Sequence, residues 1–155
     1  TLSWLFMAGR NFVYTMIRAM NSRESVQVVS DQQGTPTFAG TLARVIVDIL
    51  ERSAAGCPIP YGIYQVTDLG QTSWYDFTLA IQKQAAALGN LDGRSCTVRA
   101  CTTADYPTPA KRPAYSVLSK DKIQAALGIE LPQWQDSLAV FLGSPLIDKT
   151  GFTAC

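Results

Sequence analysis

The chain has 155 residues, of which 47% are hydrophobic and 16% charged, and its formal net charge is +1. Such a chain is long enough for one globular domain with a real core, and its small charge gives no long-range attraction for nucleic acid or an anionic membrane surface. No apolar run reaches the roughly 18 residues of a membrane-spanning helix. From the small charge and the lack of such a run, we expect neither nucleic acid nor a membrane as a partner.

The residue inventory also limits the chemistry. The sequence has no histidine, which excludes every nucleophile that a histidine would activate. The cysteines are Cys57, Cys96, Cys101 and Cys155, irregularly spaced and without a C-x-x-C pair, so we expect no metal site and no disulfide framework. Reduced cysteines favour a cytoplasmic location.

The first elements are a strand, a helix and a second strand. Residues 2–7 form a continuous apolar run, typical of a strand buried on both faces. Asn11 can cap the helix that follows, and residues 26–30 have the pattern of a short strand. The inner face of that first helix would carry Phe12, Val13, Met16, Ile17 and Met20.

A polar, turn-rich loop follows the second strand at residues 31–37, with the sequence Asp-Gln-Gln-Gly-Thr-Pro-Thr. Gln32, Thr35 and Thr37 offer hydrogen-bond donors and acceptors, while Gly34 and Pro36 shape the turn. Burial would leave such groups without partners, so we expect the loop to face water or a polar ligand.

An amphipathic helix begins near Thr41, and its apolar residues predict one inward stripe ending before Gly56. The stripe would comprise Leu42, Val45, Ile46, Ile49 and Leu50. Residues 62–66 alternate as a strand does, and Ser73 can cap a further helix that stops at Gly89.

The last third of the chain predicts a strand at 96–101 and an extended, proline-rich segment at 102–115. A short helix capped by Ser119 and closed by Gly128 would follow, and then a final helix opened by Pro132 and Trp134. Four short strands thus alternate with five helices, which favours an α/β or α+β fold but gives few strands for a freestanding doubly wound sheet.

Several motifs, taken in order, resemble a known family. They are Thr1-Leu2-Ser3-Trp4-Leu5-Phe6, Asn11-Phe12-Val13, Asp31-Gln32-x-Gly34-x-Pro36-Thr37, Ser73-Trp74-Tyr75-Asp76-Phe77, and Tyr106-Pro107-x-Pro109-Ala110-x-Arg112-Pro113-x-Tyr115-Ser116. Together they resemble the second half of dTDP-4-dehydrorhamnose reductases, which are extended short-chain dehydrogenase/reductases, and the resemblance covers residues 1–142.

The resemblance implies an α/β chain that forms the C-terminal part of an NAD(P)-binding, Rossmann-like reductase. Residues 1–142 would then be its substrate-binding region, with leftover Rossmann strands near 2–7 and 62–66, and residues 143–155 a loose tail. The parent protein would be an oxidoreductase that uses NADPH or NADH to reduce dTDP-4-dehydro-L-rhamnose in dTDP-L-rhamnose biosynthesis.

The family's catalytic and cofactor motifs are absent from this sequence. No tyrosine has a lysine four residues later, since Tyr14 is followed by Arg18 and Tyr106 by Ala110, and no glycine-rich dinucleotide motif is present. We therefore assign no catalytic residue and expect neither NADPH nor NADH to bind this chain alone. The expected partners are a dTDP-sugar, the missing N-terminal Rossmann half and, because strand edges would be exposed, a second copy of the chain in a homo-oligomer.

Candidate substrate contacts have structural alternatives. Trp4 could stack on the sugar, as the resemblance implies, or belong to the core, and Asn11 could serve a diphosphate, a helix cap or both. The loop residues Gln32, Gly34, Thr35, Pro36 and Thr37 could bind the nucleotide-sugar or be structural. Arg112 could clamp phosphate oxygens or be a plain surface arginine.

Two other functions remain open. One is a non-catalytic regulatory subunit resembling the beta subunit of methionine adenosyltransferase. The other is a related nucleotide-sugar epimerase or dehydratase, which the loop at 31–37 disfavours.

Overall fold

The computed structural model describes residues 1–93, 95–106 and 108–145. Within them the chain forms five helices and six short strands, which confirms the predicted α/β class and the five helices. The helices are α1 (Phe12–Ser22), α2 (Ala39–Ala54), α3 (Trp74–Ala87), α4 (Asp121–Leu127) and α5 (Trp134–Gly143). The strands are β1 (Leu5–Phe6), β2 (Ser25–Val29), β3 (Gln33–Gly34), β4 (Thr37–Phe38), β5 (Thr72–Ser73) and β6 (Thr97–Cys101).

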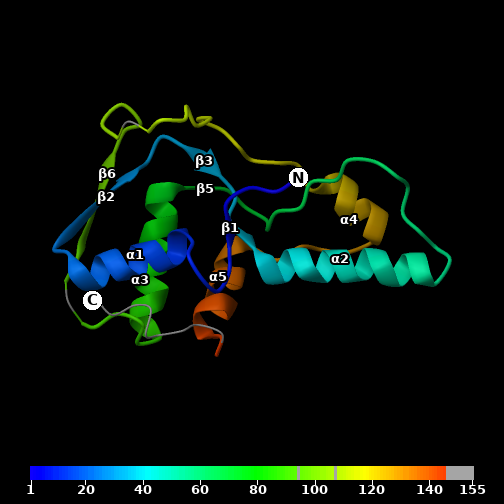
Figure 1. Cartoon of the computed structure of the whole chain (residues 1–155), viewed down its shortest axis with the longest axis horizontal. Coiled ribbons are helices and arrows are strands. Elements are labelled where there is room, and N and C mark those ends of the chain that lie inside the picture. Colours follow the sequence, from blue (N-terminus) through cyan, green and yellow to red (C-terminus); the bar gives the residue numbers. More distant parts are fainter. Residues whose placement is uncertain (94, 107, 146–155) are drawn as a thin grey trace.

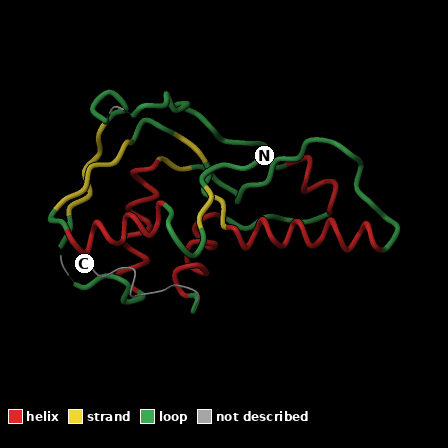
Figure 2. The backbone as a smooth tube through the Cα atoms, viewed as in Figure 1, coloured by secondary structure: helices red, strands yellow, loops and turns green. Residues whose placement is uncertain are grey.

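The strands pair two by two instead of forming one continuous sheet. β1 pairs with β4 and β2 with β6, both in parallel, while β3 pairs with β5 in antiparallel fashion. Only β2 and β6 form a long ladder, from Ser25 opposite Thr97 to Val29 opposite Cys101. The pieces lie around the helices at separate places (Figure 2). Six strands appear where four were predicted because two-residue ladders leave no periodic pattern in a sequence.

Most of the core lies between α1, α3 and α5, around β1. Its buried side chains are Phe6, Val13, Tyr14, Ile17, Phe77, Ile81, Ala85, Trp134, Leu138, Phe141 and Leu142. A second core lies between α2 and α4, built on Val45, Val66, Ile123, Leu127 and Leu131. In Figure 1 α2 and α4 form an arm that extends away from the other three helices. The molecule therefore has a packed body and a thinner arm.

The predicted caps at Asn11, Ser73 and Gly128 are confirmed, whereas the predicted cap of α4 at Ser119 was wrong, because Lys120 is the N-cap of that helix. Asn11 Oδ1 accepts from Val13 N at 2.9 Å at the start of α1, and Ser73 Oγ accepts from Asp76 N at 2.9 Å at the start of α3. Gly128 closes α4 in a left-handed conformation with φ of 63°. α4 begins at Asp121 rather than directly after Ser119, whose hydroxyl still accepts from Asp121 N at 3.3 Å.

Two predicted Rossmann strands differ in the structure. Only Leu5 and Phe6 of residues 2–7 form a strand, and Leu2, Leu5 and Met7 are exposed, so the expectation of burial on both faces was wrong. Trp4 interrupts the run with a left-handed φ of 47°. Residues 62–66 form no strand, because no neighbouring strand pairs with them in the described part of the chain. Their backbone bonds only with the backbone of Thr1 there, at 2.7 and 2.9 Å, and with the Lys122 side chain at 3.0 Å.

The apolar stripe of α2 is only partly inward. Val45 is buried, whereas 48% of Ile46 and 62% of Leu50 are exposed. Leu42, Val45 and Ile49 pack in the core between α2 and α4, whereas Ile46, Val47 and Leu50 on the opposite side of α2 are exposed. No helix among the described residues is long and apolar enough to cross a membrane. The predicted loose tail lies almost wholly at 146–155, outside the described residues.

Candidate functional site

The polar loop at 31–37 is largely buried, so the expectation that its side chains face water was wrong, whereas contact with a ligand stays a prediction. Only 6% of Gln32 is exposed, and Thr35 and Thr37 are fully buried. Gly34 and Pro36 are buried as well. The loop runs through the body of the protein between β2 and β4, where it reaches partners from distant parts of the chain.

Each buried polar side chain of the loop has a protein partner, which is why burial is possible. The Thr35 hydroxyl donates to the carbonyl oxygen of Gly70 at 2.7 Å, and the Thr37 hydroxyl donates to that of Ser3 at 2.5 Å. Gln32 Nε2 donates to the Thr103 hydroxyl at 3.0 Å. These bonds tie the loop to the N-terminal segment, to the turn before β5 and to the segment after β6.

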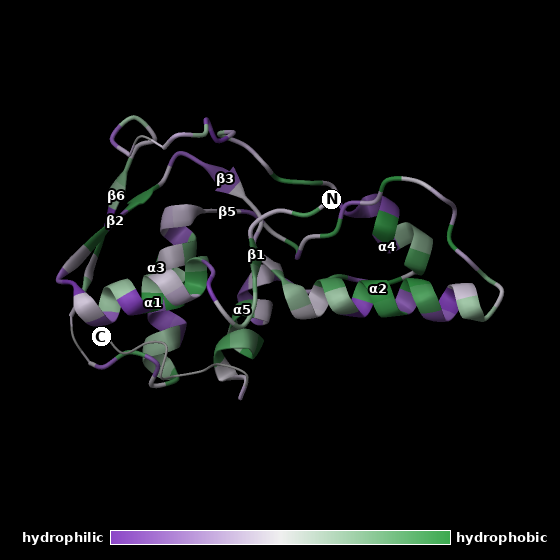
Figure 3. Cartoon of the chain, in the orientation of Figure 1, coloured by the Kyte–Doolittle hydropathy of each residue, from purple (hydrophilic) through white to green (hydrophobic). Residues whose placement is uncertain are grey.

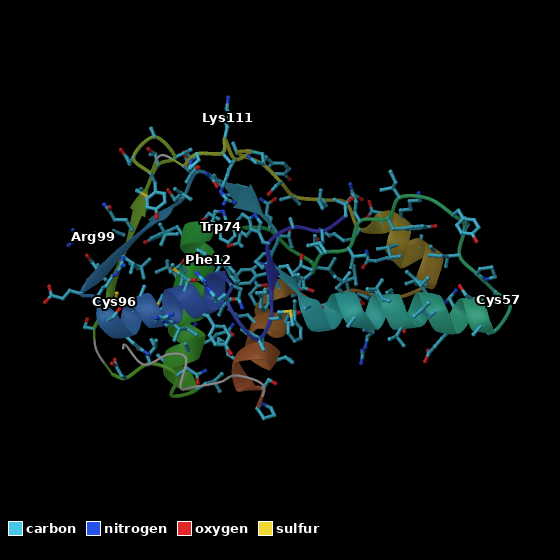
Figure 4. All side chains as sticks on the ribbon, in the orientation of Figure 1. Phe12, Cys57, Trp74, Cys96, Arg99 and Lys111 are labelled. Atoms are coloured by element: carbon cyan, nitrogen blue, oxygen red, sulfur yellow. The ribbon has the colours of Figure 1, made fainter. Side chains whose placement is uncertain are left out.

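Trp4 is half-buried and stacks on Trp74, with ring centroids 3.7 Å apart and 14° between the ring planes. Phe12 also lies against Trp74, with ring centroids 4.5 Å apart. Figure 4 shows Phe12 and Trp74 close together in the body. Trp4 directly precedes β1. One face of its indole is therefore part of the packing, and the three rings form a continuous aromatic surface.

The aromatic surface and the polar loop meet at Gly34. A β-carbon at this position would lie 2.5 Å from Trp4 Cε2 and 2.8 Å from Ser116 Oγ. The Ser116 hydroxyl also donates to the Gln33 carbonyl at 3.1 Å. Glycine is required here because any side chain would displace the indole, so Gly34 brings Trp4, the loop and Ser116 into contact.

Asn11 acts as a helix cap. Its Oδ1 accepts from Val13 N and Tyr14 N, and its Nδ2 donates to the carbonyl oxygens of Gly9, at 2.8 Å, and Met7. Asn11 is half-buried and stands directly before Phe12. The capping interpretation is confirmed, whereas contact with a nucleotide stays a prediction.

Arg112 lies in the proline-rich segment, and it is exposed. It has no hydrogen bond or ion pair with any of the described residues, so its guanidinium is available to a ligand. The neighbouring Lys111 points away from the body in Figure 4. Phosphate binding by Arg112 stays a prediction.

Three carboxyl groups have shifted pKa values. The amide and hydroxyl of Thr103 lower the pKa of Asp31, and those of Thr102 lower the pKa of Asp105. Burial raises the pKa of Asp68, although the Thr41 hydroxyl, the Phe38 amide and the Ser137 hydroxyl act in the opposite direction. Asp76 lies in the first turn of α3, where its Oδ2 accepts from the hydroxyl of the capping residue Ser73 at 2.7 Å.

Sequence reasoning missed two members of this region. Neither Trp74 nor Ser116 was predicted as a site residue; Trp74 packs against the main core and also stacks on Trp4. Both stand in the motifs that carried the family resemblance, Ser73-Trp74-Tyr75-Asp76-Phe77 and Tyr115-Ser116. Their place in these motifs was the sequence signal that could have identified both residues.

Side chains of this chain accept hydrogen bonds from backbone amides at the starts of α1 and α2. α1 follows β1 as a phosphate-binding helix would, but Asn11 Oδ1 already occupies the amides of Val13 and Tyr14 at its start. At the start of α2 the Phe38 amide donates to Asp68 Oδ2 at 3.1 Å. Nor does the described part of the chain contain a cluster of three residues able to hold a metal ion.

A separate hollow of about 1150 Å³ lies between α2 and α5. Thr41, Arg44, Asp48, Gln133 and Asp136 are among its lining residues. None of the predicted site residues lines this hollow, so it is distinct from the aromatic surface.

Comparisons with known proteins agree on one family. The sequence model of the RmlD substrate binding domain matches residues 1–145. A dTDP-4-dehydrorhamnose reductase of Aggregatibacter actinomycetemcomitans is 47% identical over 137 residues, which cover 88% of this chain and 46% of that protein. The chain spans about half the length of the curated relatives that it matches.

Solved structures of the same kind are also similar. A dTDP-4-dehydrorhamnose reductase from Clostridium acetobutylicum superposes with a TM-score of 0.78 at 35% identity, over 91% of this chain and 46% of the other. The enzyme from Bacillus anthracis, solved in complex with NADP, gives a TM-score of 0.76 at 31% identity, over 90% of this chain and 45% of the other.

Proposed function

We propose that this chain, which belongs to the RmlD substrate-binding domain family, holds the nucleotide-sugar in a dTDP-4-dehydrorhamnose reductase. The whole protein would reduce dTDP-4-dehydro-L-rhamnose, the step for which its relatives are named. The chain would supply binding and orientation, while the hydride donor and the proton donor would belong to residues outside it.

One observation carries this proposal: the stacked Trp4 and Trp74 meet the polar loop at Gly34, beside the segment that bears Arg112. An aromatic face suits a deoxysugar ring or a thymine base, and an unpaired guanidinium suits the two phosphates between them. These are the chemical parts of a nucleotide-sugar, which therefore matches the composition of this surface.

Each predicted residue has a place in the proposal. Trp4 would offer the ring face that is not stacked on Trp74, Asn11 would hold the start of α1 beside it, and Arg112 would clamp the diphosphate. The loop residues would shape the surface from behind. In that role the buried hydroxyls of Thr35 and Thr37 fix the backbone, while Gln32, Gly34 and Pro36 set its course beneath the indole.

We further propose that NADPH or NADH binds to another part of the protein. The relative from Bacillus anthracis was solved with NADP, whereas in this chain the Val13 and Tyr14 amides at the start of α1 donate to Asn11, and the Phe38 amide before α2 donates to Asp68. The natural partner would be a nucleotide-binding half comparable to the part of the relatives that this chain does not match.

The outer face of α2 is a suitable contact for that half. It carries an uncovered apolar stripe, defined here as Ala43, Ile46, Val47, Leu50 and Ala54. Residues three and four apart share one face of a helix, so these side chains lie together. Figure 3 shows the hydrophobic colouring along the exposed arm, and a stripe of this kind marks an interaction surface.

Calorimetric titration with dTDP tests the binding role. The wild-type chain should bind dTDP, and Arg112→Ala should weaken binding by roughly tenfold or more, since a charge-assisted bidentate contact contributes about 1.5–3 kcal/mol. Lys111→Ala is the matched control and should change little. If the wild type fails to bind dTDP, the proposed function is wrong; if Arg112→Ala binds as the wild type does, Arg112 is outside the site.

A second assay tests the division of labour. The isolated chain should oxidise no NADPH in the presence of dTDP-4-dehydro-L-rhamnose. Measurable turnover would place the catalytic groups within these residues and contradict their assignment elsewhere.

A further inference from the structure

The segment that bears Arg112 is tied at both ends to the polar loop. We call residues 103–114 the strap; its described part excludes residue 107. At its first end, Asp31 Oδ1 accepts from the Thr103 hydroxyl at 2.8 Å, and Asp31 Oδ2 accepts from the Thr103 amide at 2.9 Å. Gln32 Nε2 donates a hydrogen bond to the same Thr103 hydroxyl at 3.0 Å.

The second end is tied through the backbone of Gln33. Its amide donates to the Ala114 carbonyl at 2.8 Å, and its carbonyl accepts from the Ser116 amide at 2.8 Å. Consecutive residues 31, 32 and 33 therefore hold both ends of the strap. Figure 1 shows this segment passing along β3 on its way from β6 toward α4.

Between the ties, the described residues of the strap form hydrogen bonds only with one another and with Thr102. The described hydrogen bonds of residues 104–113 all remain within residues 102–113, such as those from Thr102 to Asp105 Oδ2 and from the Thr108 hydroxyl to the Ala110 carbonyl. The described residues from 102 to 115 are also exposed. The position of Arg112 consequently depends on the two ties more than on packing.

Of the two ties, the one at Asp31 is made by a side chain and is charge-assisted. Its carboxylate accepts from an amide and a hydroxyl of one residue, an arrangement that favours the ionised form. Thr103 accordingly lowers the pKa of Asp31, so the carboxylate is charged at neutral pH.

We propose that Asp31 is a positioning residue for nucleotide-sugar binding: by holding Thr103 it sets the path of the strap and, with it, the place of the Arg112 guanidinium. This inference rests on the proposed function, because it concerns the same site. Asp31 does not itself contact the nucleotide-sugar. Its effect reaches the ligand through the strap.

The test compares four proteins in dTDP titrations: wild type, Asp31→Ala, Arg112→Ala and the double variant. Loss of the Asp31 bonds should weaken binding roughly threefold to tenfold, since a net hydrogen bond contributes about 0.5–1.5 kcal/mol. The double variant should bind no more weakly than Arg112→Ala alone, because Asp31 acts through Arg112. Asp121→Ala removes an equally exposed carboxylate on α4 and should leave binding unchanged.

A measurement without nucleotide separates positioning from contact. Amide hydrogen exchange at residues 103–106 should be faster in Asp31→Ala than in the wild type, while Asp31→Asn, which keeps an acceptor, should restore part of the protection. Unchanged exchange, or Asp31→Ala binding equal to wild type while Arg112→Ala is weakened, would overturn the role of Asp31. Wild-type binding with an unaffected Arg112→Ala would instead remove Arg112 from the proposed site.

Discussion

The indole of Trp4 lies so close to Gly34 that a β-carbon there would come within 2.5 Å of Trp4 Cε2. The ring has little freedom to move, because it also stacks on Trp74 with ring centroids 3.7 Å apart. The contact therefore couples the shape of the polar loop to the position of the aromatic surface.

Gly34→Ala should displace Trp4 and loosen its stack on Trp74. Overpacking of this kind costs about 1–3 kcal/mol of unfolding free energy, which urea denaturation would measure. Tryptophan fluorescence should shift in the folded protein, and dTDP binding should weaken. Gly143→Ala is the control, because a β-carbon at Gly143 meets nothing within 4 Å; equal behaviour of the two variants would contradict the close contact.

Thr35→Val tests whether the buried loop hydroxyls are structural. The Thr35 hydroxyl donates to the Gly70 carbonyl at 2.7 Å, and valine leaves that carbonyl without its partner at nearly constant volume. We expect a loss of roughly 1–3 kcal/mol in unfolding free energy, measured by urea denaturation.

The exposed Thr15→Val serves as the comparison and should remain within about 0.5 kcal/mol of the wild type. A Thr35→Val variant of wild-type stability that no longer binds dTDP would mean that this hydroxyl contacts the ligand directly.

Features set by local sequence were predictable. The cap at Asn11, the start of α3 at Ser73 and the left-handed end of α4 at Gly128 follow from residues within one turn of each site. The burial of the polar loop was not predictable, because Thr35 and Gln32 bond to residues 35 and 71 positions away. A sequence pattern shows that a group needs a partner and not where that partner lies.

The same limit applies to apolar residues. Ile46 and Leu50 have the spacing of core residues, yet they face outward, because spacing defines a helix face without naming what covers it. Residues 62–66 alternate as a strand does, but a strand also requires a neighbour that Thr1 alone does not supply. The candidate site was found chiefly through motifs, and its stacked tryptophans only through the structure.

The apolar stripe of α2 should make the isolated chain self-associate. Burying it against a second copy removes apolar surface from water, and the free edge of β1 offers a further contact. Sedimentation velocity should show a dimer or larger assembly, and Leu50→Glu, at a side chain that is 62% exposed, should shift it toward monomer.

The matched control for this prediction is Val140→Glu, since Val140 is 63% exposed on α5, outside the stripe. It should leave the assembly unchanged. A monomeric wild-type chain would contradict the expected self-association.

The stability of the chain should depend on pH through Asp68. Its carboxyl is fully buried, and burial raises its pKa above the ordinary value of 3.8. The folded state therefore keeps the proton to a higher pH than the unfolded state does. As pH rises from the ordinary value through the raised one, the unfolded state loses its proton first, so unfolding free energy falls across this window.

Asp68→Asn should remove that fall, because the amide does not titrate and its oxygen can still accept from the Phe38 amide. Urea denaturation across pH 4–8 should show a wild-type minus variant difference that becomes more negative with rising pH. Asp68→Ala should instead lower the unfolding free energy by about 1–3 kcal/mol at every pH measured, since the Phe38 amide loses its acceptor. Asp31 and Asp105 have lowered pKa values, so they make the unfolding free energy rise with pH. Their contribution is the same in the wild type and the variant and cancels in the difference. A difference that stays flat would show that Asp68 titrates alike in the folded and unfolded states, contrary to its burial beneath the start of α2.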